Sequence, residues 1–508
     1  MNENQDEARE GGDYIARCSL TARQEGKERM RAWIRAAIAV WALCALSTAS
    51  TVYAETRIRE IQGRGHTSPM LGAKVQAVPG VITATRANGF FMQDPEPDED
   101  LATSEALFVL SRGEVKVGEW VLVTGRVAEY VPGGPKAETY LTQTELIATS
   151  VKTQGSDHPL PPPMPLGVGG RVVPERISPK LDDGAQAFDP QSSALDFYES
   201  MEGMRVRVLD AIVVGPTNAG GEAVIAPVSL AKRSARGTLT IGAENFHSER
   251  IMLDDVWTPL PVARVGDRLG DVEGILTYAF GHYVLYPTTM PLLQAGRLAP
   301  EFARDPGTGE LSIASFNVEN LDARDPPGKF EQLARQIVQH LKSPEIVGLL
   351  EVQDDNGAID NGQVSADETL QKLVNVVATL GGPRYHWRSV DPMNNADGGE
   401  PGANIRPVLL FDPARIEAVD RNAGGANLRV LEIESQAALS RSPGRVAPWH
   451  PAYALSRKPL AVEFRHRGRP LFVFLNHFNS KRGDEPLFGR RQPPYRDSEA
   501  RRAEQASV

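Results

Sequence analysis

The sequence predicts a multidomain, β-rich protein: an N-terminal β-barrel, a second β-rich domain, and an incomplete α/β four-layered sandwich at the C-terminus. The chain has 508 residues, too many for one hydrophobic core. Short strands broken by Gly, Pro and Asn fill the first part, whereas strands alternate with amphipathic helices from Leu311 onward. Two breaks, 155–169 and 296–310, separate the three parts.

The charge and the cysteine content exclude some classes of protein. A net charge of −10 argues against a protein that coats nucleic acid through bulk positive charge. It does not argue against an enzyme that meets nucleic acid at one local site. Cys18 and Cys44 both precede the predicted signal cleavage site, so we expect the mature chain to hold no disulfide.

Residues 1–54 have the order of a secretory signal. Basic residues in 27–35 precede an apolar run, 36–46, and small residues then lead to Ala54. The run is shorter than the ~20 residues of a spanning helix. We therefore predict cleavage near Ala54, a secreted (extracellular or periplasmic) location and no stable membrane anchor, with a signal anchor or membrane-lying helix as the alternative. The polar stretch before Met30 is unlike a signal, so we expect it to be a spurious extension.

Residues 57–150 are predicted to form a small barrel. Their apolar runs are short and β-like, and the alternation in 121–127 suits a half-buried strand. The predicted strands are Ala73 to Val78, Gly80 to Thr85, Phe90 to Gln93, Ala106 to Leu110, Trp120 to Val127 and Tyr140 to Ala148.

Two motifs of this region resemble a known module. They are Gly89-Phe90-Phe91-Met92-Gln93-Asp94 and Val117-Gly118-Glu119-Trp120-Val121. They are similar to the OB-fold that precedes the catalytic domain of secreted bacterial nucleases, although Asp is commoner at position 119. The resemblance implies a barrel that holds an oligonucleotide or a glycan; a purely structural barrel is the alternative. Phe90, Phe91 and Trp120 are the candidates for stacking on bases, but one or two of them must fill the barrel.

Residues 170–295 follow a proline-rich linker and are again strand-rich. Segments 202–206 and 266–287 resemble the second β-region of the same nucleases, whose role stays open. The predicted strands are Met204 to Val214, Ala223 to Ala226, Arg250 to Leu253, Leu269 to Tyr278 and His282 to Tyr286.

Residues 311–508 alternate between strand and helix. Apolar residues recur at helical spacing in 330–341 and again in 370–380. Layers of sheet with helices outside are the expected outcome. The predicted strands are Leu311 to Phe316, Glu345 to Leu350, Val408 to Phe411, Leu460 to Phe464 and Leu471 to Leu475.

Asn317 and Glu351 each end an apolar strand, and one helix separates them. Adjacent strands would deliver both side chains to one edge of the sheet, where a carboxylate can bind Mg²⁺, or Ca²⁺ or Mn²⁺, and an amide can orient it. The segments Ser315 to Leu321 and Leu349 to Asp354 resemble the endonuclease/exonuclease/phosphatase (DNase I-like) superfamily. That resemblance implies that Asn317 is catalytic and that Glu351 binds the metal.

A second constellation is Asp391-Pro392, Asp397-Gly398-Gly399 and Asn404-Ile405-Arg406, similar to a segment of the secreted nucleases. Arg406 is the predicted phosphate ligand because a planar guanidinium binds phosphate oxygens in pairs. A surface arginine that caps the strand is the alternative. Pro407 departs from the family, since a proline inside a central strand removes a ladder hydrogen bond.

A third motif, Asn476-His477-Phe478-Asn479-Ser480-Lys481, follows an apolar strand. It resembles the N-H-F-K-S-K-like segment of the secreted nucleases, although Asn479 stands where Lys is commoner. The resemblance implies that His477 is a general acid or a hydrogen-bond donor to phosphate. Asn479 and Lys481 are assigned to the substrate phosphate.

The superfamily also has a G-D-x-N-like turn and a final Asp-His pair, and neither follows His477. We therefore expect a C-terminally truncated, weakly active or inactive form of a secreted metal-dependent phosphodiesterase. The predicted parent is an extracellular endonuclease that acts on DNA or RNA, with nucleic acid as substrate and no obligate protein partner. The alternatives are a phosphatase or phospholipid phosphodiesterase of the same superfamily, and a non-catalytic secreted nucleic-acid or glycan binding module.

Overall fold

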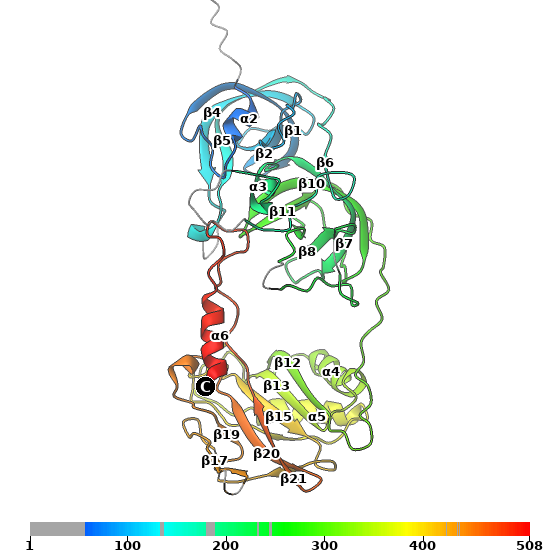
Figure 1. The fold of residues 1–508 in the computed structure, drawn as a ribbon, viewed down its shortest axis with the longest axis vertical. Helices are drawn as coiled ribbons and strands as arrows, with labels where there is room; N and C mark the ends of the chain where they lie inside the picture. The colour runs from blue at the N-terminus through cyan, green and yellow to red at the C-terminus, as the bar shows by residue number, and fades with distance from the viewer. Residues whose placement is uncertain are drawn as a thin grey trace, which may run out of the picture.

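The computed structural model describes residues 56–132, 137–178, 188–230, 233–242, 246–422, 424–433, 435 and 437–508. The predicted signal segment lies outside these ranges. The described chain forms an upper lobe of strands β1–β11 and a lower lobe of strands β12–β21 (Figure 1). No helix within these ranges is long and apolar enough to cross a membrane. The predicted domain boundaries stay predictions.

The first part of the upper lobe is a closed barrel with the strand order β1-β2-β3-β5-β4. Two predicted strands merge into β1, which continues through a register shift between Val75 and Val78 where Ala77 has φ 53°. Phe90 lies in the apolar interior. The elements are α2 (Ile58–Gln62), β1 (Lys74–Arg86), β2 (Gly89–Gln93), β3 (Ala106–Leu110), β4 (Trp120–Tyr130), η1 (Ala137–Thr139) and β5 (Gln143–Gly155).

The second part of the upper lobe is also a ring of strands. Its sheet has the order β10-β11-β9-β8-β7-β6, and β7 pairs with β10 as well, so five strands close on themselves. All five predicted strands of this region are confirmed. The elements are β6 (Met164–Leu166), α3 (Ala194–Glu199), β7 (Arg205–Gly215), β8 (Ala223–Pro227), β9 (Ile251–Leu253), β10 (Arg268–Ala279) and β11 (His282–Pro287).

The two barrels have the same topology. In the first, β3 and β5 pair in parallel and every other pair along the ring is antiparallel. In the second, β9 and β11 make the corresponding parallel pair, and the remaining four pairs are again antiparallel. The second β-rich region is therefore a repeat of the first barrel in strand order and direction.

The repeat extends to a turn before β4 and before β10. In turn 117–119 the glycine N–H donates to the Ile82 carbonyl, and the Ile82 N–H donates to the carbonyl of the following glutamate, both at 2.9 Å. In turn 265–267 the glycine N–H donates to the Val213 carbonyl at 2.8 Å, and the Val213 N–H donates to the following aspartate carbonyl at 2.9 Å. Both glycines have φ near +90° (86° and 89°), which favours glycine.

The lower lobe contains two four-stranded sheets packed face to face. Helices α4 and α5 cover the outer face of the first sheet, β12-β13-β15-β14, through apolar positions such as Phe330 and Leu373. The other face packs on β20 of the second sheet, which also holds β16, β19 and β21. The elements are β12 (Ile313–Leu321), α4 (Pro327–Arg335), η2 (Gln336–His340), β13 (Ile346–Val352), α5 (Asp367–Thr379), β14 (His386–Arg388), β15 (Arg406–Phe411), β16 (Glu417–Val419), β17 (Glu432–Ile433), β18 (Ala438–Leu439), β19 (Gly444–Arg445), η4 (Pro451–Tyr453), β20 (Leu460–His466), β21 (Arg469–Leu475) and α6 (Asp497–Ser507).

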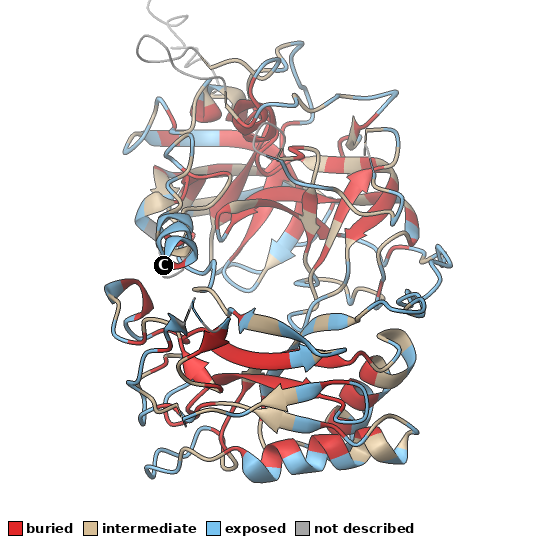
Figure 2. Ribbon diagram, turned by 60° about the horizontal axis from the view of Figure 1, so that its bottom comes forward, coloured by how far each residue is buried: buried red, intermediate tan, exposed pale blue. Residues whose placement is uncertain are grey.

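The predicted α/β four-layered sandwich is wrong. A fourth layer would need helices on the outer face of the second sheet, and α6 instead packs against η4. The described lobe thus has three layers, one of helices and two of sheet, with buried strands between exposed outer surfaces (Figure 2). The physical reason lies in the sequence, because the helical period ends with α5 and the stretch 406–475 supplies strands. The chain is multidomain and mostly β-sheet, with few helices.

A segment of the lower lobe returns to the upper lobe and packs into the second barrel. The Phe488 side chain is buried against Tyr198 and Tyr283, with ring centroids 5.8 and 5.6 Å away. Its carbonyl accepts a hydrogen bond of 2.7 Å from the Tyr278 hydroxyl, and the Arg490 N–H donates to the first barrel. We call residues 485–492 the strap. Figure 1 shows it rising beside the first barrel, with α6 below it.

His66 links the first barrel to α3. Its Nε2 lies 2.7 Å from an oxygen of Asp196, and its Nδ1 lies 3.2 Å from Glu199. Burial alone lowers the pKa of His66, but the two carboxylates outweigh burial and raise the pKa to about 10. The imidazole is therefore charged at neutral pH, and the ion pairs join the two barrels.

We predict that Phe488→Ala releases the strap. The substitution leaves a cavity among the tyrosines and removes about 3–5 kcal/mol of packing free energy. Hydrogen exchange should become much faster at the Arg490 amide and its neighbours. Phe302→Ala, which removes an exposed ring from the linker, is the control and should leave that exchange unchanged. Equal protection in the Phe488 variant and the native chain would contradict the prediction.

We predict that His66 stabilises the upper lobe below about pH 10. Its folded pKa is raised above the usual 6.5, so the stabilisation is complete below pH 6.5 and is lost as the pH rises through 10. His66→Gln should lower the melting temperature at pH 7 by about 2–4 °C and make little difference at pH 10.5. Melting curves at both pH values, with the exposed His386→Gln as control, check this. A His66 effect that is the same at both pH values would refute it.

Candidate functional site

Three predicted site residues meet at one end of the first sheet of the lower lobe. The Asn317 Nδ2 donates a hydrogen bond of 2.9 Å to Oε1 of Glu351. The His477 Nε2 lies 3.6 Å from the same oxygen. Asn317 comes from β12, Glu351 from β13, and His477 follows β21 of the second sheet. The packing of the two sheets therefore brings Glu351 together with Asn317, which lies 34 positions before it, and with His477, which lies 126 positions after it.

The backbone around Glu351 is irregular on its β12 side. Asn317 pairs with Leu350, and pairing resumes only where Leu321 meets Val352. Three residues of β12 therefore face the single Glu351, which adopts φ +65°. A non-glycine residue in this left-handed region is strained, and such residues are concentrated at functional sites.

The ladder is also irregular on the β15 side. Leu349 pairs with Val408 and Val352 pairs with Arg406, so two residues of β13 face the single Pro407. A proline has no N–H to give to the ladder, and the bulge places it where the ladder is interrupted. The sequence departure at 407 is thus accommodated by an irregularity of the ladder between β15 and the strand that carries Glu351.

His477 is held as a neutral imidazole. Burial lowers its pKa to about 4, and the positive charges of Arg457 and Arg502 act in the same direction against the opposing charge of Glu351. Its Nδ1 is buried and has no hydrogen-bond partner among the described residues. At neutral pH the imidazole is uncharged, so one ring nitrogen carries an N–H that can donate a hydrogen bond and the other can accept one.

Arg457 and Gln505 belong to the site and were missed from the sequence. The buried Arg457 donates to the Phe478 carbonyl at 2.7 Å and interacts electrostatically with Glu351. Gln505 of α6 accepts from the Asn479 N–H at 2.7 Å and donates to the Ala452 carbonyl at 2.9 Å. Arg457 could have been recognised in the sequence as a basic residue shortly before the predicted strand that begins at Leu460. Gln505 had none, because its partners lie in distant loops.

Asn479 and Lys481 occupy the loop after His477. The Asn479 carbonyl accepts from Arg502 at 2.8 Å, and its side chain donates to the Ser480 carbonyl at 3.2 Å. Lys481 is exposed. The assignment of both to a substrate phosphate stays a prediction.

The backbone of Arg406 pairs with Val352 beside the Glu351 bulge, but its side chain has partners outside the cluster of Asn317, Glu351 and His477. Its side chain is completely buried, paired with Asp391, and donates to the Asn404 carbonyl at 2.9 Å. A phosphate would have to replace Asp391 to reach it, and the predicted phosphate role stays untested. The motif around it is a buried polar junction, in which Asp397 pairs with Arg445 at 2.8 Å and Lys458 at 2.9 Å.

The donor set around Glu351 fits a hard divalent cation. Mg²⁺ commonly takes one or two protein carboxylates and completes its shell with water and substrate phosphate oxygens. Glu351 is partly exposed and held by Asn317, as such a ligand requires. The described residues include no group of three or more His, Cys, Asp or Glu arranged to hold a metal. A bound cation would therefore rely on Glu351, with water or substrate for the rest.

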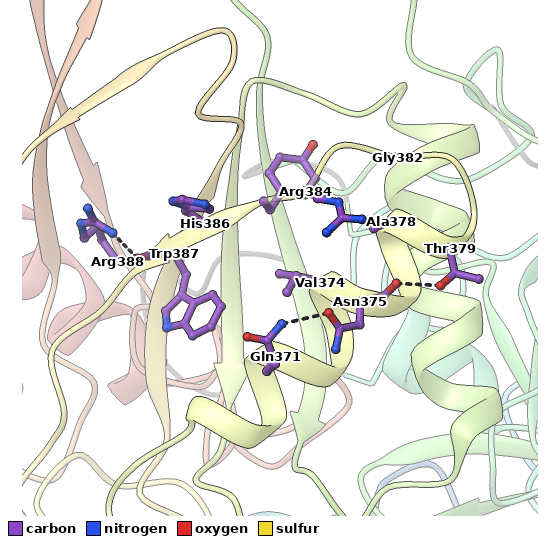
Figure 3. Close-up of a pocket in the computed structure, with 11 residues that line it drawn as sticks. Gln371, Val374, Asn375, Ala378, Thr379, Gly382, Arg384, His386, Trp387 and Arg388 are labelled. Atoms are coloured by element: carbon purple, nitrogen blue, oxygen red, sulfur yellow. Dashed lines mark hydrogen bonds between the residues drawn. The ribbon is translucent and has the colours of Figure 1, made fainter.

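A large surface groove lies away from this site. It has a volume of 910 Å³ and is lined by side chains of α5 and of the β14 region, among them Asn375, Arg384 and His386 (Figure 3). Gln371 donates to Asn375 along the helix at 2.9 Å. Asn317, Glu351 and His477 do not line it, so we do not assign the chemistry to this groove.

Comparisons with known proteins give limited similarity. A family model described as "Domain of unknown function (DUF8508)" matches residues 165–295, which include the second barrel. No curated protein matches. A solved structure, "Crystal structure of humanized D. rerio TDP2 by 14 mutations", is 16% identical with a TM-score of 0.20. The match covers 34% of this chain and 49% of that chain, about half its length.

We predict that Glu351→Gly is more stable than Glu351→Ala. Alanine keeps the cost of a left-handed backbone, about 1–2 kcal/mol, and glycine does not. The melting temperature of the lower lobe should differ by roughly 2–4 °C in favour of glycine. Glu417, an exposed strand residue, is the control, and its alanine variant should be the more stable one. If the alanine variant were the more stable one at both positions, the proposed backbone strain at Glu351 would be contradicted.

Proposed function

We propose that the chain is a divalent-cation-dependent phosphodiester hydrolase that acts on nucleic acid. The observation that carries this proposal is the meeting of Asn317, Glu351 and His477 at the strained bulge of β13. A carboxylate, an amide and a neutral imidazole within one polar cluster suit the binding and hydrolysis of a phosphodiester. The sequence resemblance of the strands that carry them supports the same reaction.

The residues divide the work in the following way. Glu351 would hold Mg²⁺ or a similar ion, which supplies Lewis-acid stabilisation of the phosphate charge when bound. Asn317 fixes the direction of that carboxylate. The neutral His477 hydrogen-bonds a phosphate oxygen or accepts a proton from the attacking water. Its low pKa argues against a general acid that is already charged before the reaction.

The charges around His477 favour an anionic substrate. Arg457 and Arg502 act electrostatically on the imidazole, and Arg501 lies close enough to act on Arg457. Lys481 and Arg482 extend this positive surface and are exposed. The chain as a whole is acidic, so this local surface is the feature that would attract a phosphate backbone.

Cleavage of supercoiled plasmid and of bis(p-nitrophenyl) phosphate tests the proposal. We expect slow hydrolysis with Mg²⁺ or Mn²⁺ that stops on addition of EDTA. Glu351→Gln and His477→Ala should each lower the rate by about 10²-fold or more, because each removes a group needed in the transition state. Asn317→Ala should have a smaller effect, since it removes only the orientation of the carboxylate.

Glu417→Gln is the matched control, because it neutralises an exposed carboxylate of the same lobe away from the cluster. It should leave the rate unchanged. The proposal fails if the cleavage resists EDTA, if Glu351→Gln cleaves like the native chain, or if neither substrate is cleaved.

A further inference from the structure

The groove between α5 and β14 lies along an unpaired edge of the first sheet of the lower lobe. β14 is the last strand of that sheet, and within the part of the chain that the structure describes it pairs only with β15. An edge strand presents N–H and C=O groups that no neighbouring strand uses. The groove, with its volume of 910 Å³, therefore lies beside main-chain groups that can still form hydrogen bonds.

Side chains from both faces of β14 line the groove. His386 and Arg388 lie over the Phe411 ring, on the face toward the second sheet, with the imidazole centroid 5.8 Å and the guanidinium carbon 5.1 Å from the ring centre. Trp387 lies on the opposite face and packs on the core beneath the helices. All three line the groove together with residues of α5 (Figure 3). A hollow bordered by both faces of a strand runs along the edge of that strand, so the unpaired main-chain groups of β14 open into it.

The wall opposite β14 is the outer surface of α5. Gln371 and Asn375 are exposed on this wall, and the Gln371 Nε2 donates to the Asn375 Oδ1 at 2.9 Å. The Gln371 carbonyl oxygen, the Asn375 N–H groups and the Trp387 indole N–H have no hydrogen-bond partner among the described residues. Ala378 is the small residue of the wall and leaves room for a side chain of a ligand. The groove thus offers donors, an acceptor and an apolar surface.

The groove continues past β14, and its two ends carry opposite charges. A second hollow of 450 Å³ shares Arg388 with it and is bordered by Asp367 and Asp391. At the first end Arg384 is exposed and has no ion-pair partner in the described ranges. Arg388, between the two ends, is already neutralised by Asp420 through two hydrogen bonds of 2.6 Å. A polyanion would meet carboxylates at one end, so this pattern favours a ligand with charges of both signs.

We propose that this groove binds an extended peptide segment of another protein, which adds a strand to β14. Main-chain pairing with the edge supplies affinity, and alternate side chains of the peptide lie against α5, where Trp387 and Ala378 accept an apolar one. An acidic residue of the peptide pairs with Arg384, and a basic residue near its other end meets Asp367. This surface is separate from the cluster around Glu351, so peptide binding is an activity distinct from phosphodiester hydrolysis.

Selection from a library of random dodecapeptides, followed by fluorescence anisotropy with the selected peptide on the full chain, tests the proposal. We expect peptides that are rich in β-branched residues and carry at least one acidic residue. Arg384→Glu should weaken binding by about tenfold or more, because it turns an ion pair into a repulsion. Ala378→Arg should have a similar effect, since the long side chain fills the groove while arginine remains a good helix former.

Arg335→Glu is the matched control, because it reverses the charge of an exposed arginine on α4 that does not line the groove. It should bind the peptide as the native chain does, and all three variants should keep the native melting temperature. Two versions of the selected peptide, methylated at alternate main-chain nitrogens, report on strand pairing. Only alternate N–H groups of a strand face its neighbour, so one version should lose binding by about tenfold or more and the other should keep it.

The proposal is overturned if no peptide is enriched over a counter-selection on Ala378→Arg, if Arg384→Glu binds the selected peptide as tightly as the native chain does, or if both methylated peptides bind like their parent. Two other results in place of peptide binding would also overturn it. Dimerisation that Ala378→Arg abolishes would assign the edge to a second copy of the chain, and oligonucleotide binding that Arg384→Glu abolishes would assign it to nucleic acid.

Discussion

The insertion of Phe488 into the second barrel ties the two lobes together. The ring completes a core of tyrosines that the barrel's own strands leave open, and its carbonyl satisfies a buried Tyr278 hydroxyl. The chain then turns into α6, whose Gln505 holds the loop after His477. One aromatic contact in the upper lobe is thus connected, through a short stretch of chain, to the residues around Glu351.

The sequence predicted the elements of the lower lobe better than their arrangement. The helical spacing in 330–341 and 370–380 corresponds to α4 with η2 and to α5, and the apolar runs correspond to β13, β15, β20 and β21. The prediction of four layers was wrong because the periodicity of a segment shows which of its faces is apolar but not which sheet covers that face. Both helices pack on the same sheet, and the second sheet has no helices to cover it.

The sequence predicted those residues of the candidate site that have a polar, chemically capable side chain at the end of an apolar strand. Asn317, Glu351 and His477 each end an apolar run, and the sheets bring them together. Arg406 instead begins an apolar strand, and its side chain is buried and paired with Asp391. The sequence pattern also could not distinguish Phe90 from Phe91. Phe90 fills the first barrel, whereas Phe91 lies between the barrels. The bulge at Glu351 depends on both neighbouring strands, so no single segment could have revealed it.

The matching strand order of the two barrels creates a hazard during folding. Neighbouring domains with the same topology can exchange equivalent strands and become trapped as misassembled chains. The two interiors differ in a way that opposes such exchange. The first is mostly aliphatic, with Phe90 as its aromatic member, whereas the second is built around Tyr198, Tyr278 and Tyr283 and receives Phe488. A strand from one barrel would therefore bring side chains of the wrong size and polarity into the other, and each barrel selects its own strands.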